Sequence, residues 1–130
     1  MQFVVTPVVV ALMGLILLGL SWRVVDLRRR HRINLGDGGR PDLERAIRVH
    51  GNFVEYVPLA LLLLLVLEAG GEMPRWLLAA LGGLLVVGRL LHAQGLASRP
   101  GASFGRFAGT LATWVTILLA SALNLYGAIF

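Results

Sequence analysis

The chain of 130 residues contains no cysteine and no lysine. Without cysteine the protein forms no disulfide, has no thiolate nucleophile of its own and builds no zinc site from thiolates. Its three histidines, His31, His50 and His92, are too far apart in sequence to form a metal-binding pair on one helical turn. The sequence therefore excludes cysteine chemistry and gives no sign of a metal site.

Acidic residues are also scarce: seven aspartates and glutamates stand against twelve basic residues, all arginine, for a net charge of +5. A basic chain raises the question of nucleic-acid binding. Here most arginines stand at the ends of apolar runs, where the positive-inside rule of membrane proteins already accounts for them. We therefore expect no nucleic-acid partner.

Apolar residues dominate, at 57% of the chain, above the half that soluble domains usually contain. Four segments reach the roughly 20 helical residues that cross a hydrocarbon core. The first has neither a basic leader nor a small-residue cleavage site, so we expect it to remain as a helix. We predict an all-α fold, a single integral membrane domain over 1–130 that forms a four-transmembrane-helix bundle with spans at about 4–22, 44–68, 75–97 and 104–128.

Arginines also predict the orientation of the bundle. They cluster after the first span, from Arg23 to Arg32, and around the third connection, at Arg99 and Arg106. The second connection, around Glu68 and Glu72, is acidic. An even number of crossings puts both basic connections on one side, so we expect them in the cytoplasm and both termini outside.

The first connection, from Arg28 to Asp42, is the only long one and is rich in glycine. It lacks the Gly-Lys-Ser/Thr that would complete a phosphate-binding loop. We interpret it as a flexible connection, with Asp42 as the N-cap of the next helix.

Small residues predict close helix contacts at two places, Gly105 with Gly109 and Ala79 with Gly83. Four helices in so short a chain bury little surface within one subunit. Self-association is therefore expected, although the spacing of these residues gives no number of subunits.

Polar side chains enter the second span along one face, at Arg45, Arg48, Asn52, Glu55 and Tyr56. Each ionised side chain at bilayer depth costs about 2.5 to 3.5 kcal/mol. One glutamate does not neutralise this face, so it requires compensation from elsewhere in the bundle.

The other spans supply further cations. Arg89, His92, Leu96 and Arg99 share a face of the third span, and Arg106 begins the fourth. Contacts between helices and positive-inside flanking account for the arginines from 23 to 32, for Ser121 and for Asn124. For Arg48, Asn52, Glu55 and Arg106 two interpretations remain open: a structural role, or a site for an anion such as a lipid headgroup or a small carboxylate.

The stretch from Glu44 to Leu59, ERAIRVHGNFVEYVPL, resembles the second-helix signature of the MAPEG family, the membrane-associated proteins of eicosanoid and glutathione metabolism. The signature is an arginine, an asparagine four residues on, a glutamate three further, and often a tyrosine and a proline. The stretch from Gly88 to His92 is similar to the prostaglandin E synthase branch. The resemblance covers essentially the whole chain, is greatest to the small bacterial members, and implies a homotrimer with glutathione bound between adjacent subunits.

The resemblance also implies roles for individual residues. Arg48, Asn52, Glu55 and Tyr56 would hold the peptide part of glutathione, and Arg89 and His92 would line the same site. Arg106, aligned after an insertion in the 98–104 connection, would stabilise the glutathione thiolate as the catalytic residue, and Arg28 or Arg30 of the first connection would contribute. The family's tyrosine one turn after the His92 position is replaced by Leu96, which removes a hydroxyl that binds or activates glutathione.

Two functions follow from these expectations. The first is a glutathione-dependent transferase of the microsomal glutathione S-transferase type, or a peroxidase, in a bacterial inner membrane, acting near the cytoplasmic face on a lipophilic electrophile. The missing cysteine fits this function, because glutathione would supply the thiol. The alternative is a non-catalytic membrane protein of the same fold that binds an anionic ligand or lipid headgroup, and Leu96 favours it. An anion channel is disfavoured because the charges gather at one membrane face.

Overall fold

The computed structural model describes residues 3–98 and 103–130, and only the backbone of residues 96–98. The described residues form four α-helices: α1 (Val5–His31), α2 (Pro41–Gly70), α3 (Arg75–Ser98) and α4 (Phe104–Ile129). Each is long and apolar enough to cross a membrane. The prediction of an all-α protein with four such helices is confirmed. The connection predicted to be basic at Arg99, and the Leu96 side chain, lie outside the described part of the chain.

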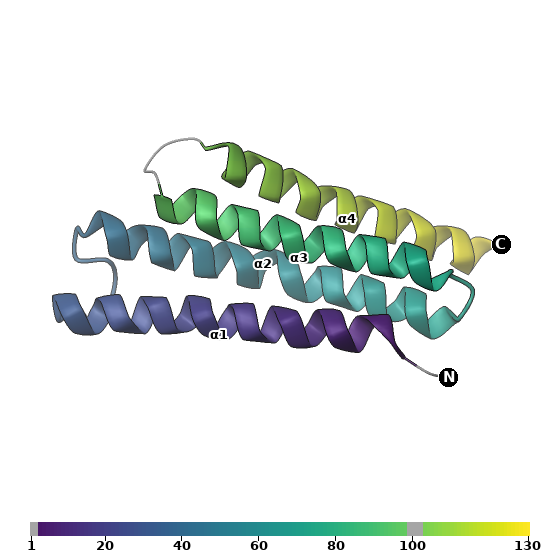
Figure 1. Ribbon diagram of the computed structural model, residues 1–130, viewed down its shortest axis with the longest axis horizontal. Helices are drawn as coiled ribbons and strands as arrows, with labels where there is room; N and C mark the ends of the chain where they lie inside the picture. The colour runs from purple at the N-terminus through teal and green to yellow at the C-terminus, as the bar shows by residue number, and fades with distance from the viewer. Residues whose placement is uncertain (1–2, 99–102) are drawn as a thin grey trace.

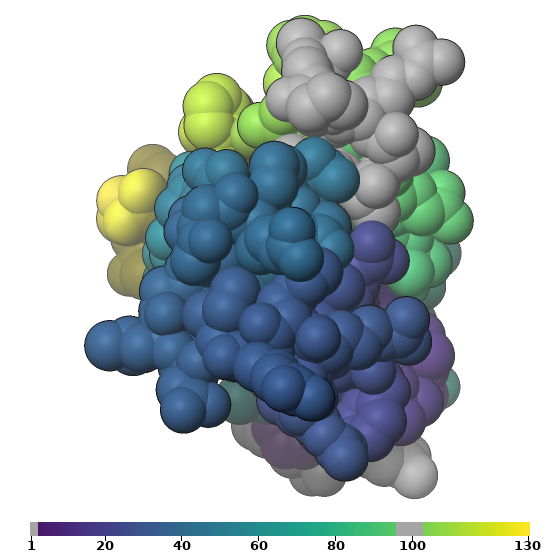
Figure 2. Space-filling model, turned by 90° about the vertical axis from the view of Figure 1, so that its left-hand side faces the viewer, coloured from purple at the N-terminus to yellow at the C-terminus, as the bar shows by residue number. Residues whose placement is uncertain are grey.

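The helices run alternately up and down, with α1 and α4 on opposite sides of the α2–α3 pair (Figure 1). Both chain termini lie at one end of the bundle, here called the termini end. The α1–α2 connection and the first turn of α4 lie at the other, here called the arginine end, which faces the viewer in Figure 2. At 1.5 Å per residue the helices are about 36 to 45 Å long, more than a hydrocarbon core of about 30 Å, so their ends reach the headgroup regions.

Helix α1 is longer than the first predicted span. It continues through Arg23 to His31, so the prediction that the connection begins at Arg28 is wrong. Arginine is a good helix former, and basic side chains in the last turn favour the helix C-terminus. The helix ends at His31, and Arg32, the C-cap residue, adopts the left-handed conformation with a φ of 56°.

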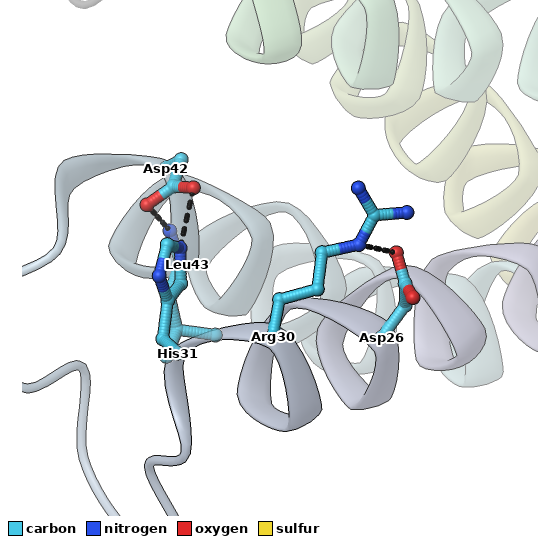
Figure 3. Close-up of polar contacts among 5 residues, drawn as sticks. All are labelled: Asp26, Arg30, His31, Asp42 and Leu43. Carbon is cyan, nitrogen blue, oxygen red and sulfur yellow. Dashed lines mark hydrogen bonds and ion pairs between the residues drawn. The ribbon is translucent and has the colours of Figure 1, made fainter.

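The prediction that Asp42 caps α2 is also wrong. Arg40 occupies the N-cap without a side-chain hydrogen bond, and Pro41 is the first helical residue, a position that suits its fixed φ and missing N–H. Asp42 instead contacts Nε2 of His31 at 2.8 Å, and its other carboxylate oxygen accepts a hydrogen bond from the Leu43 N–H at 2.9 Å (Figure 3). The His31–Asp42 contact holds the end of α1 against the start of α2.

The apolar core joins all four helices along their facing sides, with Ala120 as the buried contribution of α4. Its buried side chains include Val9 and Met13 of α1, Phe53, Val57 and Leu64 of α2, and Leu78, Leu81 and Leu85 of α3. The outer faces of α1 and α4 expose large apolar side chains, among them Leu18, Trp22 and Leu118. Such surfaces suit a lipid environment, in which tight packing between helices supplies most of the association energy.

Glycines let α3 and α4 touch backbone to backbone. A Cβ atom on Gly105 would lie 2.7 Å from the Leu91 carbonyl oxygen, and one on Gly95 would lie 2.6 Å from the Arg106 nitrogen. A Cβ on Gly109 would lie 2.6 Å from the His92 nitrogen. The predicted close approach at Gly105 and Gly109 is therefore confirmed, and we call this contact the glycine seam.

The second small-residue pair does not make such a contact within the chain. Ala79 and Gly83 are exposed, and a Cβ on Gly83 would meet no atom within 4 Å. Gly82, next to Gly83, packs against α1 instead, where a Cβ on Gly82 would lie 2.5 Å from a methyl carbon of Val9. A close contact of Ala79 and Gly83 with another subunit stays a prediction.

Glu68 belongs to α2 and is buried, although its sequence position indicated an acidic connection. One carboxylate oxygen accepts the N–H groups of Val4 and Val5 at 2.7 and 2.8 Å, and the other accepts that of Thr6 at 2.6 Å. The first N–H groups of a helix have no partner inside it and carry partial positive charge. Glu68 therefore caps α1 from a neighbouring helix.

Asn124 links α4 to α2. Its amide nitrogen donates to the Leu63 carbonyl oxygen at 3.0 Å and to the Ala120 carbonyl oxygen at 2.8 Å. The predicted structural role for Asn124 is thus confirmed.

Candidate functional site

A pocket of about 250 Å³ opens at the arginine end, between α2, α3 and α4. It brings together four of the residues singled out from the sequence: Arg48, Asn52, His92 and Arg106. The rest of its lining comes from the first turns of α2, at Pro41, Glu44 and Arg45.

Helix α2 sets the position of three of these side chains. Arg45, Arg48 and Asn52 follow one another at three and four residues, so they lie along one side of the helix. Ala46, Val49 and Phe53 are buried on a neighbouring side of the helix, and their packing fixes the rotation of α2. The burial pattern of α2 therefore aims the polar side at the pocket.

The glycine seam positions the other wall. Gly109 allows α4 to approach the backbone of His92 on α3, and Gly95 allows α3 to approach the backbone of Arg106 on α4. His92 on α3 and Arg106 on α4 are brought into one pocket by this contact.

Arg89 lies behind the pocket wall. Its side chain is only 1% exposed, and its Nη2 donates a hydrogen bond to Oδ1 of Asn52 at 2.8 Å. Nη2 also lies 3.4 Å from Nδ1 of His92, which acts as the acceptor because a guanidinium has no lone pair to offer. The guanidinium carbon lies 5.6 Å from the centre of the Phe53 ring. Arg89 thus links two residues of the pocket lining without lining it itself.

Positive charge exceeds negative charge at this site. The lining has three arginines and one glutamate, Glu44, and Arg89 adds a further buried cation. The ion pairs that join described residues, Arg30–Asp26 and His31–Asp42, both lie outside it. Nε of Arg89 is buried with no hydrogen-bond partner among the described atoms. A buried charge without an opposite partner is costly, so the site favours an anion.

Glu55 and Tyr56 lie beyond the pocket lining. Glu55 is exposed on the outward side of α2, two turns past Arg48. The side chains of Arg48 and Glu55 make no hydrogen bond or ion pair with another described residue. Tyr56 is half-buried. The pocket of one chain therefore includes the first half of the polar face of α2 and not the second.

Arg28 and Arg30 are not part of the pocket either. Nη1 of Arg28 donates to the Gly36 carbonyl oxygen at 2.8 Å. Nε of Arg30 contacts Asp26 at 2.8 Å along α1, as Figure 3 shows. Both belong to the last turns of α1, outside the lining of this pocket.

Pro41 and Glu44 were not singled out as site residues from the sequence, and Arg45 was noted only as part of the polar face. The sequence interpretation started the second helix at residue 44, so it left out the turn that contains Pro41. The available signal was spacing, because Glu44 precedes Arg48 by one helical turn.

Known proteins resemble this chain along nearly its full length. The sequence model of the MAPEG family matches residues 6–126. The inner membrane protein YecN of Escherichia coli strain K12 is 39% identical over 122 residues, which cover 94% of this chain and 91% of YecN. YecN of E. coli O6:H1 strain CFT073 matches with the same values.

Proposed function

Because the chain belongs to the MAPEG family of membrane proteins, we propose that it is a glutathione-dependent transferase or peroxidase that acts on a lipophilic electrophile. The observation that carries the proposal is the surplus of positive charge in the pocket at the arginine end, with the buried Arg89 behind it. Glutathione is an anion with two carboxylates, which arginine forks bind well.

In this proposal, different residues of the pocket bind different groups of glutathione. Arg48 and Asn52 bind the carboxylate and peptide groups, and Glu44 or Glu55 accepts the ammonium group. Arg89 is a positioning residue, because it touches Asn52 and His92 and not the pocket itself. Its buried charge also strengthens the attraction for an anion, since the surroundings are apolar.

We assign to Arg106 the role of stabilising the thiolate of glutathione. Glutathione supplies the nucleophile, whose sulfur forms a bond to an electrophilic carbon while the leaving group departs with its electron pair. The Arg106 guanidinium stabilises the negative charge on that sulfur. Its place at the start of α4, near the membrane surface, lets the thiol proton leave to water while a lipophilic substrate arrives from the bilayer.

We propose that the complete site forms between subunits of a homotrimer. The pocket of one chain, at about 250 Å³, is smaller than the roughly 300 to 1,000 Å³ of most small-molecule sites. Arg48 and Glu55 both point outward from α2, and Glu55 does so at a depth where an ionised group needs a partner. A neighbouring subunit supplies this partner, and its Arg28 or Arg30 completes the site. In this proposal the arginine end faces the cytoplasm.

A second candidate function is a non-catalytic protein that uses the same pocket to hold an anionic ligand or a lipid headgroup. The observation that favours it is Leu96, which provides no hydroxyl at the position where the family has a tyrosine. Binding and thiol activation must therefore be tested separately.

Titration of the purified protein with glutathione tests the first step. We expect saturable binding, a loss of about tenfold or more in affinity for Arg48→Ala, and a smaller loss for Glu55→Gln, since a hydrogen bond to a charged group is worth about 1.5 to 3 kcal/mol. Arg75→Ala, at the exposed start of α3 and the other end of the bundle, is the matched control. Absence of saturable binding by the wild type refutes the proposal.

Absorbance of the bound thiolate tests the second step. We expect a thiolate band on glutathione binding that Arg106→Gln removes while Arg75→Ala retains it. Binding without this band would favour the non-catalytic function. The subunit number, measured by mass in a mild detergent, tests the assembly, and a monomer or dimer would contradict the shared site.

A further inference from the structure

A second cavity at the arginine end lies on another side of α2, between α1, α2 and α3. Its volume is about 200 Å³. Its lining combines two arginines and a glutamine with apolar side chains, namely Leu20, Arg23, Arg45, Ala46, Val49, Ala93 and Gln94. Only Arg45 also lines the pocket assigned to glutathione.

The charged groups of this cavity are all of one sign. Arg23 comes from α1 and Arg45 from α2, and the lining contains no carboxylate. Neither arginine takes part in the ion pairs of the described residues, which use Arg30 and His31 as cations. Two guanidinium groups on separate helices can bind the oxygens of one anion from two sides.

The depth of the cavity indicates which anion reaches it. Arg23 directly follows Trp22, which is 64% exposed on α1, and tryptophan prefers the boundary between hydrocarbon and headgroups. The exposed side of α1 is apolar at Leu15, Leu18 and Val25 and basic at Arg29, so the change falls within two turns of Trp22. Arg23 therefore lies at the level of the lipid phosphates.

The other walls of the cavity suit a lipid as well. Leu20, Ala46, Val49 and Ala93 form an apolar surface beside the two arginines. A free anion in water gains nothing from such a surface, whereas the glycerol backbone and the first methylene groups of a phospholipid lose water-exposed area against it.

We propose that this cavity binds the phosphate group of an anionic phospholipid from the surrounding leaflet. Arg23 and Arg45 bind the phosphate oxygens, and the apolar walls contact the adjoining part of the lipid. This site is separate from the glutathione pocket and does not depend on that assignment.

The test compares two lipids that differ in charge. The full-length protein, purified in a neutral detergent, is heated with added phosphatidylglycerol or with phosphatidylcholine of the same acyl chains. We expect phosphatidylglycerol to raise the unfolding temperature saturably, and phosphatidylcholine to raise it much less. Equal effects of the two lipids on the wild type would overturn the proposal.

Two arginine variants test whether phosphatidylglycerol acts at this cavity. Arg23→Gln should reduce the phosphatidylglycerol shift to the level of phosphatidylcholine, while Arg29→Gln, which removes an exposed arginine from the same helix outside the cavity, should retain it. If both variants keep the full shift, or lose it equally, the lipid is bound by general attraction to the basic helix end and the proposal is wrong.

Inorganic phosphate tests whether the cavity binds free phosphate or the phosphate group of a lipid. At constant ionic strength we expect it to give no saturable shift, because it makes no contact with the apolar walls. A shift as large as that of phosphatidylglycerol would overturn the assignment to a lipid. Native mass spectrometry of the wild type checks the result without any variant: retained phosphatidylglycerol in excess of phosphatidylcholine is expected, and equal retention contradicts the proposal.

Discussion

The Oδ1 atom of Asn52 accepts a hydrogen bond from the buried guanidinium of Arg89 at 2.8 Å, and this contact ties the polar face of α2 to α3. Asn52 lines the pocket and Arg89 supports it from behind. The pair therefore belongs both to the stability of the bundle and to the shape of the site.

Asn52→Leu removes the acceptor and leaves the Arg89 charge without this partner. We expect a loss of about 1.5 to 3 kcal/mol in the free energy of unfolding, the usual range for a hydrogen bond to a charged group. Asn52→Asp keeps an acceptor oxygen and adds a carboxylate, so it should retain stability. Denaturant unfolding in detergent measures both variants, and a Leu variant more stable than the Asp variant would contradict the role of this contact.

Glu68→Ala removes the carboxylate that caps the start of α1. We expect a loss of about 1 to 3 kcal/mol in unfolding free energy, because the N–H groups of Val4, Val5 and Thr6, of which that of Thr6 is buried, lose their acceptor. Hydrogen exchange at these three amides should accelerate. Glu72→Ala, exposed at the same end of the bundle, is the control and should leave their exchange unchanged.

Gly109→Ala inserts a methyl group into the glycine seam. The new Cβ would lie 2.6 Å from the His92 nitrogen and 2.7 Å from the His92 Cβ, and would also collide with the Gly88 carbonyl oxygen. Overpacking of this kind costs about 1 to 3 kcal/mol and should move His92 away from Arg106. In Gly127→Ala, on the same helix, the Cβ meets nothing within 4 Å, so this variant should be as stable as the wild type. Thermal unfolding measures both variants. Equal decreases in the unfolding temperature would contradict the close packing of α3 and α4 at the glycine seam.

Leu96→Tyr tests the proposed glutathione-dependent activity, because it introduces the hydroxyl that the family resemblance implies at this position. A phenol that donates to a thiolate contributes about 1.5 to 3 kcal/mol, so we expect the turnover of glutathione with a lipophilic electrophile to rise about tenfold or more. Leu96→Phe supplies the ring without the hydroxyl and should not raise it. Equal activities of the Tyr and Phe variants would assign the effect to ring packing.

The sequence predicts the helices well because membrane spans depend on composition over about 20 residues, which is a strong signal. It predicts their ends poorly. The run from Arg23 to His31 is helical and polar, so hydropathy marks the edge of the membrane and not the end of α1. Pro41 marks the start of α2 more accurately than Asp42, since α2 starts without a side-chain cap.

The sequence predicted which residues share a side of a helix, and it predicted only part of how the helices meet at the pocket. Spacing along α2 placed Arg48 and Asn52 on one side, and the pocket contains both. Periodicity could not tell that Arg89 lies behind His92, because their order within the wall depends on how closely the glycines let α3 and α4 approach. The contact of Glu68 with the start of α1 joins residues more than 60 positions apart, and local pattern carries no information about it.

The position of Arg45 between two cavities has a thermodynamic consequence. One guanidinium cannot neutralise two anions as fully as it neutralises one, so occupation of either cavity weakens the other. Such linkage is reciprocal: the charge of the leaflet lipids would set the apparent affinity for glutathione, and glutathione would by the same factor loosen the bound lipid. If both proposed sites are occupied, membrane composition would act as an effector of the glutathione pocket through the shared Arg45 side chain.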